Sequence, residues 1–355
     1  MKLSETTKQK IAQLIAKDFV CHIFNERLKK YYSDFKEVKS IETKPFKKHL
    51  GLTSAVFVVE YQIKYLSSQG ALKDLDIFVS AHSDGSRKGA YEKTKTLYEH
   101  GFGQGKYRVT KPLFFLDEQQ AFFYVSSPGR SFFSFFLENT QADLTKAMEL
   151  MAGWLKQLHN FDTKIANFKW PIFNILDMVP TPQKFVKDFY NSSDKLGQHM
   201  DNLVKDLQAL DLEYRQKNKE TLVYGDFHPE NVIMRGLDVQ DIEMIDFTDI
   251  ALGDPMMDIG AFIQQFDFMG HNFISRPEID RHKQSFVEIY FGQKFEEIDI
   301  EYINRINLYQ SWTAMRTAVF LFYMKNVFNP IDDLLLDSIK YLDMAKNSQR
   351  AINIS

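Results

Sequence analysis

The stretch that most constrains this chain runs from Leu222 to Asn231 and has the sequence LVYGDFHPEN. A second apolar segment follows it and ends in Ile245-Asp246-Phe247. Asp226 and Asn231 have the D-x-x-x-x-N spacing at which a carboxylate accepts a hydroxyl proton and an amide oxygen helps to hold magnesium during phosphoryl transfer. Asp246 would supply a second oxygen ligand for the same ion. Residue type and spacing therefore predict a phosphoryl-transfer site.

The residues between the two parts of this motif predict a β-hairpin. Apolar segments at 232–234 and 242–245 flank a turn at 235–238. Pairing centred between Asp238 and Val239 would set Asn231 opposite Asp246, with the Cβ atoms about 4.5–5.5 Å apart. One hard cation could then bridge the carboxylate and amide oxygens, whereas zinc would prefer His or Cys.

These residues also have an ordinary structural explanation, because Asp and Asn are common in turns at strand ends. The strand that leads into Gly225-Asp226, the stiff His228-Pro229 step and the second strand that ends at Asp246 together favour the catalytic interpretation. For His228, a packing and hydrogen-bonding role that supports the loop is favoured over a role as general base.

The motif resembles a known family. The segments GDFHPEN at 225–231, IDF at 245–247 and GDPMMD at 253–258 are similar to the signature of the aminoglycoside phosphotransferase and choline kinase superfamily, over 155–262. The resemblance implies an α+β, bilobal protein-kinase-like fold, with a small antiparallel-sheet N-lobe and a larger, mostly helical C-lobe. It also implies Asp226 as catalytic base, Asn231 and Asp246 as magnesium ligands, and Asp258 as structural support of the loop.

Two of the polar residues in this region have structural interpretations of their own. Asp254 followed by Pro255 is an N-cap and first-turn signal, and Asp258 in the next turn suits the helix dipole, so a structural role for Asp258 is favoured. His159 near a helix end is expected to be a core or capping histidine rather than a ligand.

Length and composition limit the number of lobes, the possible partners and the cellular compartment. A chain of 355 residues exceeds the usual single core, so two lobes are expected. The 44 basic and 47 acidic residues give a net charge of −3, which offers no field for nucleic acid or an anionic membrane. The single cysteine, Cys21, fits a reducing compartment. Without a long apolar run or signal peptide, the protein is expected to be cytoplasmic, and its oligomeric state is left open.

The order of expected elements agrees with two lobes. The turn residues at 126–129 resemble a hinge. The expected domains are therefore 1–126, an N-terminal helix with the nucleotide-binding lobe, and 127–355, a helical C-lobe with the catalytic loop and substrate site. In the first domain we expect helices at 4–30 and 90–100 and strands at 35–43, 54–61, 75–79 and 121–125; in the second, helices near 307–323 and from 331.

The nucleotide side departs from the family pattern. Gly51, Thr53 and Ser54 lie in a turn that could cradle phosphate, although any tight hairpin has similar residues. The third strand has Ser80 where the resemblance implies a lysine or arginine. Glu92 is the candidate helix glutamate. Val125 and Ser126 precede the hinge and complete the residues expected to bind ATP or GTP. Cations that flank this strand and helix are Lys73, Arg87, Lys88 and Lys93.

Two interpretations remain open. One is a kinase that uses ATP (or GTP) and Mg2+ to phosphorylate a hydroxyl of a small molecule. The alternative is a pseudokinase-like module that binds nucleotide or metabolite with weak or no transfer, because Ser80 replaces the expected lysine. Phosphorylation of proteins is disfavoured because no Ala-Pro-Glu segment follows Asp246. The acceptor pocket is expected between the catalytic loop and the helices after Phe262, with five candidates: Asp249, Asp267, Tyr309, Trp312 and Tyr323.

Overall fold

The structure is a computed structural model that describes residues 2–138, 143–165, 168–324 and 330–354. The chain divides into two compact units. The first comprises Met1–Pro128 with Glu243–Thr248, and the second comprises Gly129–Ile242 with Asp249–Ser355. The short segment Glu243–Thr248, which carries Asp246, therefore belongs to the first unit although it lies far along the chain.

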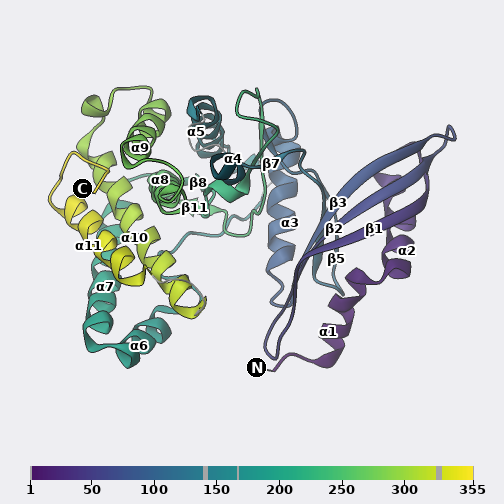
Figure 1. Cartoon of the computed structure of the whole chain (residues 1–355), viewed down its shortest axis with the longest axis horizontal. Coiled ribbons are helices and arrows are strands. Elements are labelled where there is room, and N and C mark those ends of the chain that lie inside the picture. The colour runs from purple at the N-terminus through teal and green to yellow at the C-terminus, as the bar shows by residue number, and fades with distance from the viewer. Residues whose placement is uncertain (1, 139–142, 166–167, 325–329, 355) are drawn as a thin grey trace. The chain divides into compact units, whose positions relative to one another are not determined.

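The first unit is built on a five-stranded antiparallel sheet in the order β1-β2-β3-β6-β5 (Figure 1). The strand expected to end at Thr43 continues to Leu50. A register shift between Pro45 and Lys47 accommodates the proline, which cannot donate to the ladder, on this edge strand. The strands are β1 (Phe35–Leu50), β2 (Ala55–Ser67), β3 (Leu72–His82), β5 (Pro112–Leu116) and β6 (Ala121–Val125), with the short β4 at Tyr107–Val109.

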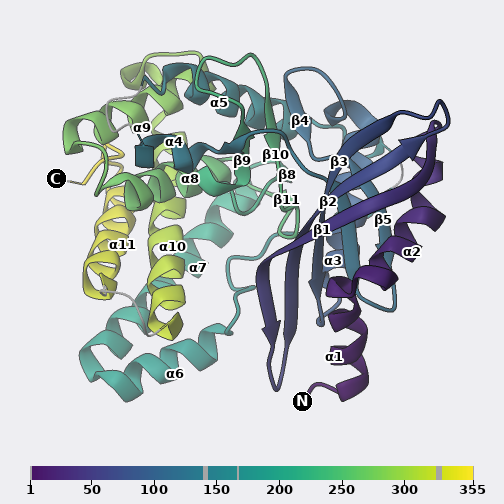
Figure 2. The same cartoon turned by 45° about the vertical axis from the view of Figure 1, so that its right-hand side comes forward.

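Helices cover both faces of this sheet (Figure 2). The expected N-terminal helix is interrupted at Ala16, which is extended, so it forms α1 (Glu5–Ala12) and α2 (Lys17–Arg27). The Phe24 ring of α2 packs 5.8 Å from the ring of Phe123. On the opposite face, Tyr91 of α3 (Ser86–Leu97) packs 5.4 Å from Phe122. Because successive strand residues point to opposite faces, Phe122 and Phe123 contact different helices.

The second unit is mostly helical. Its helices are α4 (Phe132–Glu138), α5 (Thr145–His159), α6 (Pro182–Ser192), α7 (Asp194–Lys217), α8 (Met256–Gly270), α9 (Arg276–Phe291), α10 (Ile300–Met324) and α11 (Ile331–Lys346). Its short strands are β7 (Arg130–Ser131), β8 (Thr221–Val223), β9 (Val232–Met234) and β11 (Ala251–Gly253), while β10 (Ile242–Met244) lies where the two units meet along the chain. The expected helices near 307–323 and from 331 are α10 and α11.

The long helix α10 organises the second unit. It is buried over most of its length and packs against α7, α8 and α11. Arg305 in its second turn forms a buried ion pair with Asp254, whose Oδ1 also accepts a hydrogen bond from the Met256 N–H at the start of α8. This ion pair fixes the start of α8 against α10. Residues of both helices line a pocket with the loop after β8. The expected α+β composition, with an antiparallel sheet in the first part and helices in the rest, is confirmed.

None of the helices in the described residues is both long enough and apolar enough to cross a membrane.

Candidate active site

The loop that joins β8 to β9 carries the sequence motif and depends on a glycine. Strand β8 pairs with β11, with Val223 opposite Ala251. Gly225, just after β8, has a φ of +87°, and a Cβ atom there would lie 2.6 Å from the carbonyl oxygen of Asp249. Both the backbone angle and the close approach exclude a side chain. The chain can therefore turn sharply and present Asp226 directly after the strand.

Asp258 stabilises this turn through hydrogen bonds to its backbone. It lies in the first turn of α8, where the helix dipole favours an acid, and its carboxylate is fully buried. Oδ2 accepts a hydrogen bond from the Tyr224 N–H (2.7 Å) and Oδ1 accepts one from the Gly225 N–H (2.9 Å). His159 Nε2 lies 2.9 Å from Oδ2, and its Nδ1 lies 2.7 Å from the hydroxyl of Tyr290. The carboxylate is thus used by the loop backbone, while His159 is buried and hydrogen-bonded.

Asp226 is held between two basic side chains. Arg316 Nη2 lies 3.1 Å from its Oδ1, and His228 Nε2 lies 3.4 Å from its Oδ2. Burial alone would raise the pKa of Asp226, but the hydrogen bond from His228 and the charge of Arg316 outweigh it and lower the pKa to about 2. Asp226 is therefore ionised at neutral pH.

His228 and Asn231 stabilise the same loop. The backbone N–H of Glu230 donates to His228 Nδ1 (3.3 Å), and His228 Nε2, which faces Asp226, also lies 3.0 Å from Asn231 Nδ2. Asn231, at the end of the 3-10 turn Pro229–Asn231, is buried and donates through Nδ2 to the carbonyl oxygen of Asp226 (3.1 Å). The Nδ2 group of Asn231 is thereby committed to the loop, so Oδ1 is its atom available to a cation.

Asp246 lies in the first unit and has an unusual backbone conformation. Its φ is +58°, the left-handed region that non-glycine residues seldom adopt, and such strain is concentrated at functional sites. Its Oδ1 accepts hydrogen bonds from the Thr248 hydroxyl (2.6 Å) and N–H (3.3 Å) and lies 3.2 Å from Arg87 Nη1. The predicted position of Asp246 opposite Asn231 stays a prediction.

The four cationic residues that flank Ser80 have different partners in the first unit. Lys73 pairs with Asp34 (2.6 Å) and Lys88 with Asp117 (3.2 Å). Lys93 donates to the carbonyl oxygen of Thr248 (2.6 Å). In contrast, Arg87 contacts Asp246, and its own Nε is buried without a hydrogen-bond partner among the described residues. Arg87 therefore contacts the carboxylate expected to bind magnesium.

The remaining candidate nucleotide residues also lie in the first unit. Ser80 is buried in β3, opposite Val58 and Phe122 in the neighbouring strands. Glu92 is exposed on α3 and forms no ion pair within the described part of the chain.

Backbone N–H groups of both the turn and the hinge already donate hydrogen bonds within the protein. The Gly51 N–H donates to the Ser54 carbonyl (2.8 Å), which closes a tight turn with Thr53 exposed. At the hinge, the N–H groups of Val125 and Ser126 donate to Lys111 and Asp76. Both are occupied in this structure, and the nucleotide-binding role of all these residues stays a prediction.

A pocket of about 330 Å³ opens beside Asp226 within the second unit. It lies between the loop 226–230, α8 and α10. Its lining combines the loop residues and Arg316 with apolar side chains from α8 and α10. The lining residues are Asp226, Phe227, His228, Glu230, Ala261, Gln265, Phe268, Met269, Thr313, Arg316, Thr317, Phe320 and Leu321.

None of the five expected acceptor residues lines this pocket. Asp267 pairs with Arg276 and Lys283, and the Tyr323 hydroxyl donates to Asp188. Asp249 alone is close, since its Oδ2 lies 3.4 Å from Arg316 Nη2. The expectation was wrong because aromatic and acidic residues on helices mostly find partners in the core.

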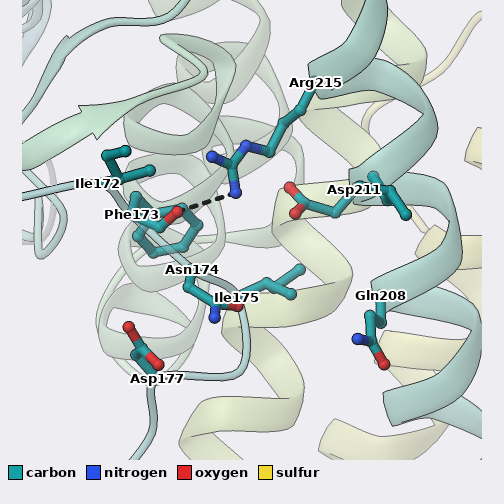
Figure 3. Close-up of a pocket in the computed structure, with 9 residues that line it drawn as sticks. Ile172, Phe173, Asn174, Ile175, Asp177, Gln208, Asp211 and Arg215 are labelled. Carbon is teal, nitrogen blue, oxygen red and sulfur yellow. Dashed lines mark hydrogen bonds between the residues drawn. The ribbon is translucent and has the colours of Figure 1, made fainter.

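Tyr309 and Trp312 instead support a second pocket, of about 380 Å³, between the segment Ile172–Asp177 and α7 (Figure 3). The Tyr309 hydroxyl donates to Asp211 (2.8 Å), and Trp312 Nε1 donates to the carbonyl oxygen of Ile175 (3.0 Å). Figure 3 shows Asp211 and Arg215 extending from α7 into this pocket. None of the proposed catalytic or metal-binding residues is part of its lining.

Arg316 was not among the residues that the sequence predicted for this site. It is the only charged residue between Ile306 and Met324, in an otherwise apolar and uncharged stretch. A lone cation on a buried helix is costly unless it has a partner, so this isolation was a usable signal. What the sequence could not supply is the partner, because Asp226 lies ninety positions earlier in the chain.

A family model described as the Phosphotransferase enzyme family matches residues 90–280, more than half of the chain. No curated protein matches the sequence. Three of the solved structures that are similar in fold illustrate the likeness. They are the amicoumacin kinase hAmiN in complex with AMP-PNP, Ca2+ and Ami (TM-score 0.57, 14% identity, 99% of this chain and 98% of that chain), an ethanolamine kinase of Plasmodium vivax (0.54, 14%, 86% and 82%), and APH(2")-IIa in complex with gentamicin (0.54, 15%, 94% and 98%). These likenesses confirm the expected fold, and the family match shows that this chain belongs to the Phosphotransferase enzyme family.

Proposed function

We propose that this protein is a small-molecule kinase that moves the γ-phosphoryl group of ATP, with Mg2+, to a hydroxyl group, and that Asp226 is its catalytic base. The observation that carries the proposal is the environment of Asp226. An ionised carboxylate, held by Arg316 and His228, lies on the wall of a pocket large enough for a small molecule. Membership of the family supplies the reaction class.

The role of Asp226 follows from its low pKa. A carboxylate with a pKa of about 2 is a weak base, so it cannot remove a proton from a resting alcohol. It can accept a hydrogen bond from the hydroxyl and orient the oxygen for attack. The proton passes to Asp226 as the bond from oxygen to the γ-phosphorus forms, the bond from that phosphorus to the bridging oxygen breaks, and ADP leaves. This late transfer suits the loose transition state of phosphoryl transfer.

The donor set fits magnesium. The amide oxygen of Asn231 and the Oδ2 atom of Asp246 are hard oxygen donors, and Mg2+ is commonly held by one or two such side chains together with phosphate oxygens. Among the described residues, no group of three or more His, Cys, Asp or Glu side chains could hold a metal alone. When bound, Mg2+ would neutralise charge that develops on the phosphates.

The serine at position 80 is the observation that favours a second candidate, a nucleotide-binding module without efficient transfer. Against it, Arg87 brings a guanidinium to Asp246 and keeps an unused donor, Nε. Arginine is always charged and recognises phosphate well. We therefore propose that Arg87 supplies the positive charge that the strand lacks at Ser80.

Turnover of ATP with Mg2+ and a panel of small alcohols tests this proposal in wild type and in Asp226→Asn. We expect ADP formation that depends on the acceptor and falls about a thousandfold in the variant, because the substitution removes the acceptor for the proton. Asp177→Asn, at an exposed aspartate in the second pocket, is the matched control and should behave as wild type.

The binding-module alternative predicts another pattern. Nucleotide would raise the melting temperature of both proteins equally, and no acceptor would increase ADP formation in wild type above Asp226→Asn. That outcome would remove the kinase proposal and leave the nucleotide site in place.

A further inference from the structure

The pocket beside Asp226 has a composition that selects among acceptors, and this argument rests on the proposed function. We infer that the acceptor is an uncharged alcohol with an apolar, aromatic-sized body, rather than a polyamine, an aminoglycoside or a quaternary amine. The inference comes from three properties of the lining: its charge, its apolar surface and the open amide oxygen of Gln265.

The charge of the lining does not suit a ligand with several cationic groups. Besides His228, the ionisable lining residues are Asp226, Glu230 and Arg316. Arg316 lies 3.1 Å from Asp226 and 3.4 Å from Asp249, and Glu230, on the exposed rim, has no cationic partner among the described residues. An acceptor with several ammonium groups would leave most of them without a counter-charge in the pocket, which is costly.

Arg316 also acts against a quaternary amine. In choline the positive charge lies two carbons from the hydroxyl, so a hydroxyl placed at Asp226 would bring that charge close to the guanidinium. The aromatic side chains of the lining are phenylalanines, which attract cations less than tryptophan does. Repulsion from Arg316 therefore opposes the one favourable contact such a ligand could make.

The apolar wall of the pocket comprises Phe268 and Met269 from α8 and Phe320 and Leu321 from α10. Phe320 is 60% exposed, which is unusual for so large an apolar side chain beside a pocket. The hydroxyls of Thr313 and Thr317 donate to carbonyl oxygens one turn earlier in α10, so these residues do not offer their donors to a ligand. An apolar body would cover this wall.

Gln265 could make a polar contact with the acceptor. Its Nε2 donates to Gln264 Oε1 and Thr317 Oγ1, both at 2.8 Å, which fixes the orientation of the amide. Its Oε1 accepts no hydrogen bond from the described residues. A second hydroxyl or an N–H group on the acceptor could donate to it.

Three probes test the inference: phenethyl alcohol, choline and gentamicin. We expect kcat/KM for phenethyl alcohol to exceed that of the other two at least tenfold. Phe320→Ser should raise the KM for phenethyl alcohol roughly tenfold and leave kcat and the KM for ATP within about twofold, because it removes apolar contact only. Leu336→Ser, at a similarly exposed apolar residue of α11, is the control and should change neither value.

Binding measured by ligand-observed NMR separates this inference from the proposed function. If phenethyl alcohol binds wild type and loses binding in Phe320→Ser, but no alcohol of the panel is phosphorylated, the preference of the pocket for an uncharged, apolar ligand stands while the kinase proposal fails. If gentamicin or choline is phosphorylated more efficiently than phenethyl alcohol, and this requires Asp226, the kinase proposal stands and the inference is overturned. An unchanged KM in Phe320→Ser also overturns it.

Discussion

Arg316 joins the proposed catalytic base to the backbone of its own loop. Its Nη2 lies 3.1 Å from Asp226 Oδ1, while its Nη1 donates to the carbonyl oxygen of Gly225 at 3.4 Å. One guanidinium thus contacts the carboxylate and the glycine turn that presents it. A change in Arg316 should therefore alter both the charge state and the position of Asp226.

Replacing Arg316 with glutamine should make activity sensitive to acid. In wild type the pKa of Asp226 is about 2, so the carboxylate stays ionised well below neutral pH. Without the guanidinium, burial raises this pKa, and activity falls as pH drops through the new value. The acid limb of the kcat/KM profile should move up by about one to two pH units. Arg276→Gln, at an arginine that pairs with Asp267 and Asp280, should leave the profile unchanged.

The pair Arg87→Met and Lys88→Met tests the proposed replacement for the missing strand cation. The two residues are neighbours on α3, but Arg87 contacts Asp246 whereas Lys88 pairs with Asp117 on the surface. Loss of a phosphate-facing cation should lower kcat/KM for ATP about a hundredfold, and Lys88→Met should stay within about twofold of wild type. Equal kinetics in the two variants would exclude a phosphate-binding role for Arg87.

Alanine at Gly225 should destabilise the protein through a contact that the structure identifies. The new Cβ atom would lie 2.6 Å from the Asp249 carbonyl oxygen, in addition to the strain of a positive φ. Gly105 has a nearly equal φ of +85° and no atom within 4 Å of such a Cβ. We expect Gly225→Ala to lower the free energy of unfolding by about 3 kcal/mol or more and Gly105→Ala by about 1 kcal/mol. Urea denaturation measures both, and equal losses would refute the contact.

Two buried aspartates should respond oppositely to asparagine. Asp258 uses both oxygens, for the N–H groups of Tyr224 and Gly225 and for His159, and an amide would turn its NH2 group toward one of these donors. Asp258→Asn should therefore cost about 2–4 kcal/mol.

Asp211 is the comparison, because burial raises its pKa and its one hydrogen bond comes from Tyr309. A raised pKa means that the folded state loses stability as pH rises above the unfolded value. Asp211→Asn cannot ionise, so its stability relative to wild type should improve from acid toward neutral pH. Chemical denaturation at pH 4 and pH 7 would show this, and a constant difference would contradict it.

The sequence predicted the parts of this protein that depend on local patterns. The motif around Asp226 and Asn231, the helices α10 and α11 and the alternating strands all follow from spacing and periodicity. The continuous N-terminal helix was wrong, because Ala16 gives no local signal of the break that lets α1 and α2 pack on the sheet. Tertiary packing decides that break.

The polar contacts of the site were much less predictable. Tyr309, Trp312 and Asp267 have residue types that suit a ligand, yet each binds a partner elsewhere in the second unit. Arg316 had no motif around it and proved to contact Asp226. Residue type therefore indicates what a side chain can do, whereas its partner depends on distances between segments far apart in the chain.

The most direct test of the account follows label from γ-32P-ATP into the acceptor in a single turnover, with Mg2+, for wild type and Asp226→Asn. We expect wild type to transfer the label and Asp226→Asn to do so about a thousandfold more slowly, with nucleotide binding unchanged. Transfer at rates within tenfold of each other in the two proteins would contradict the assignment of Asp226 as the catalytic base.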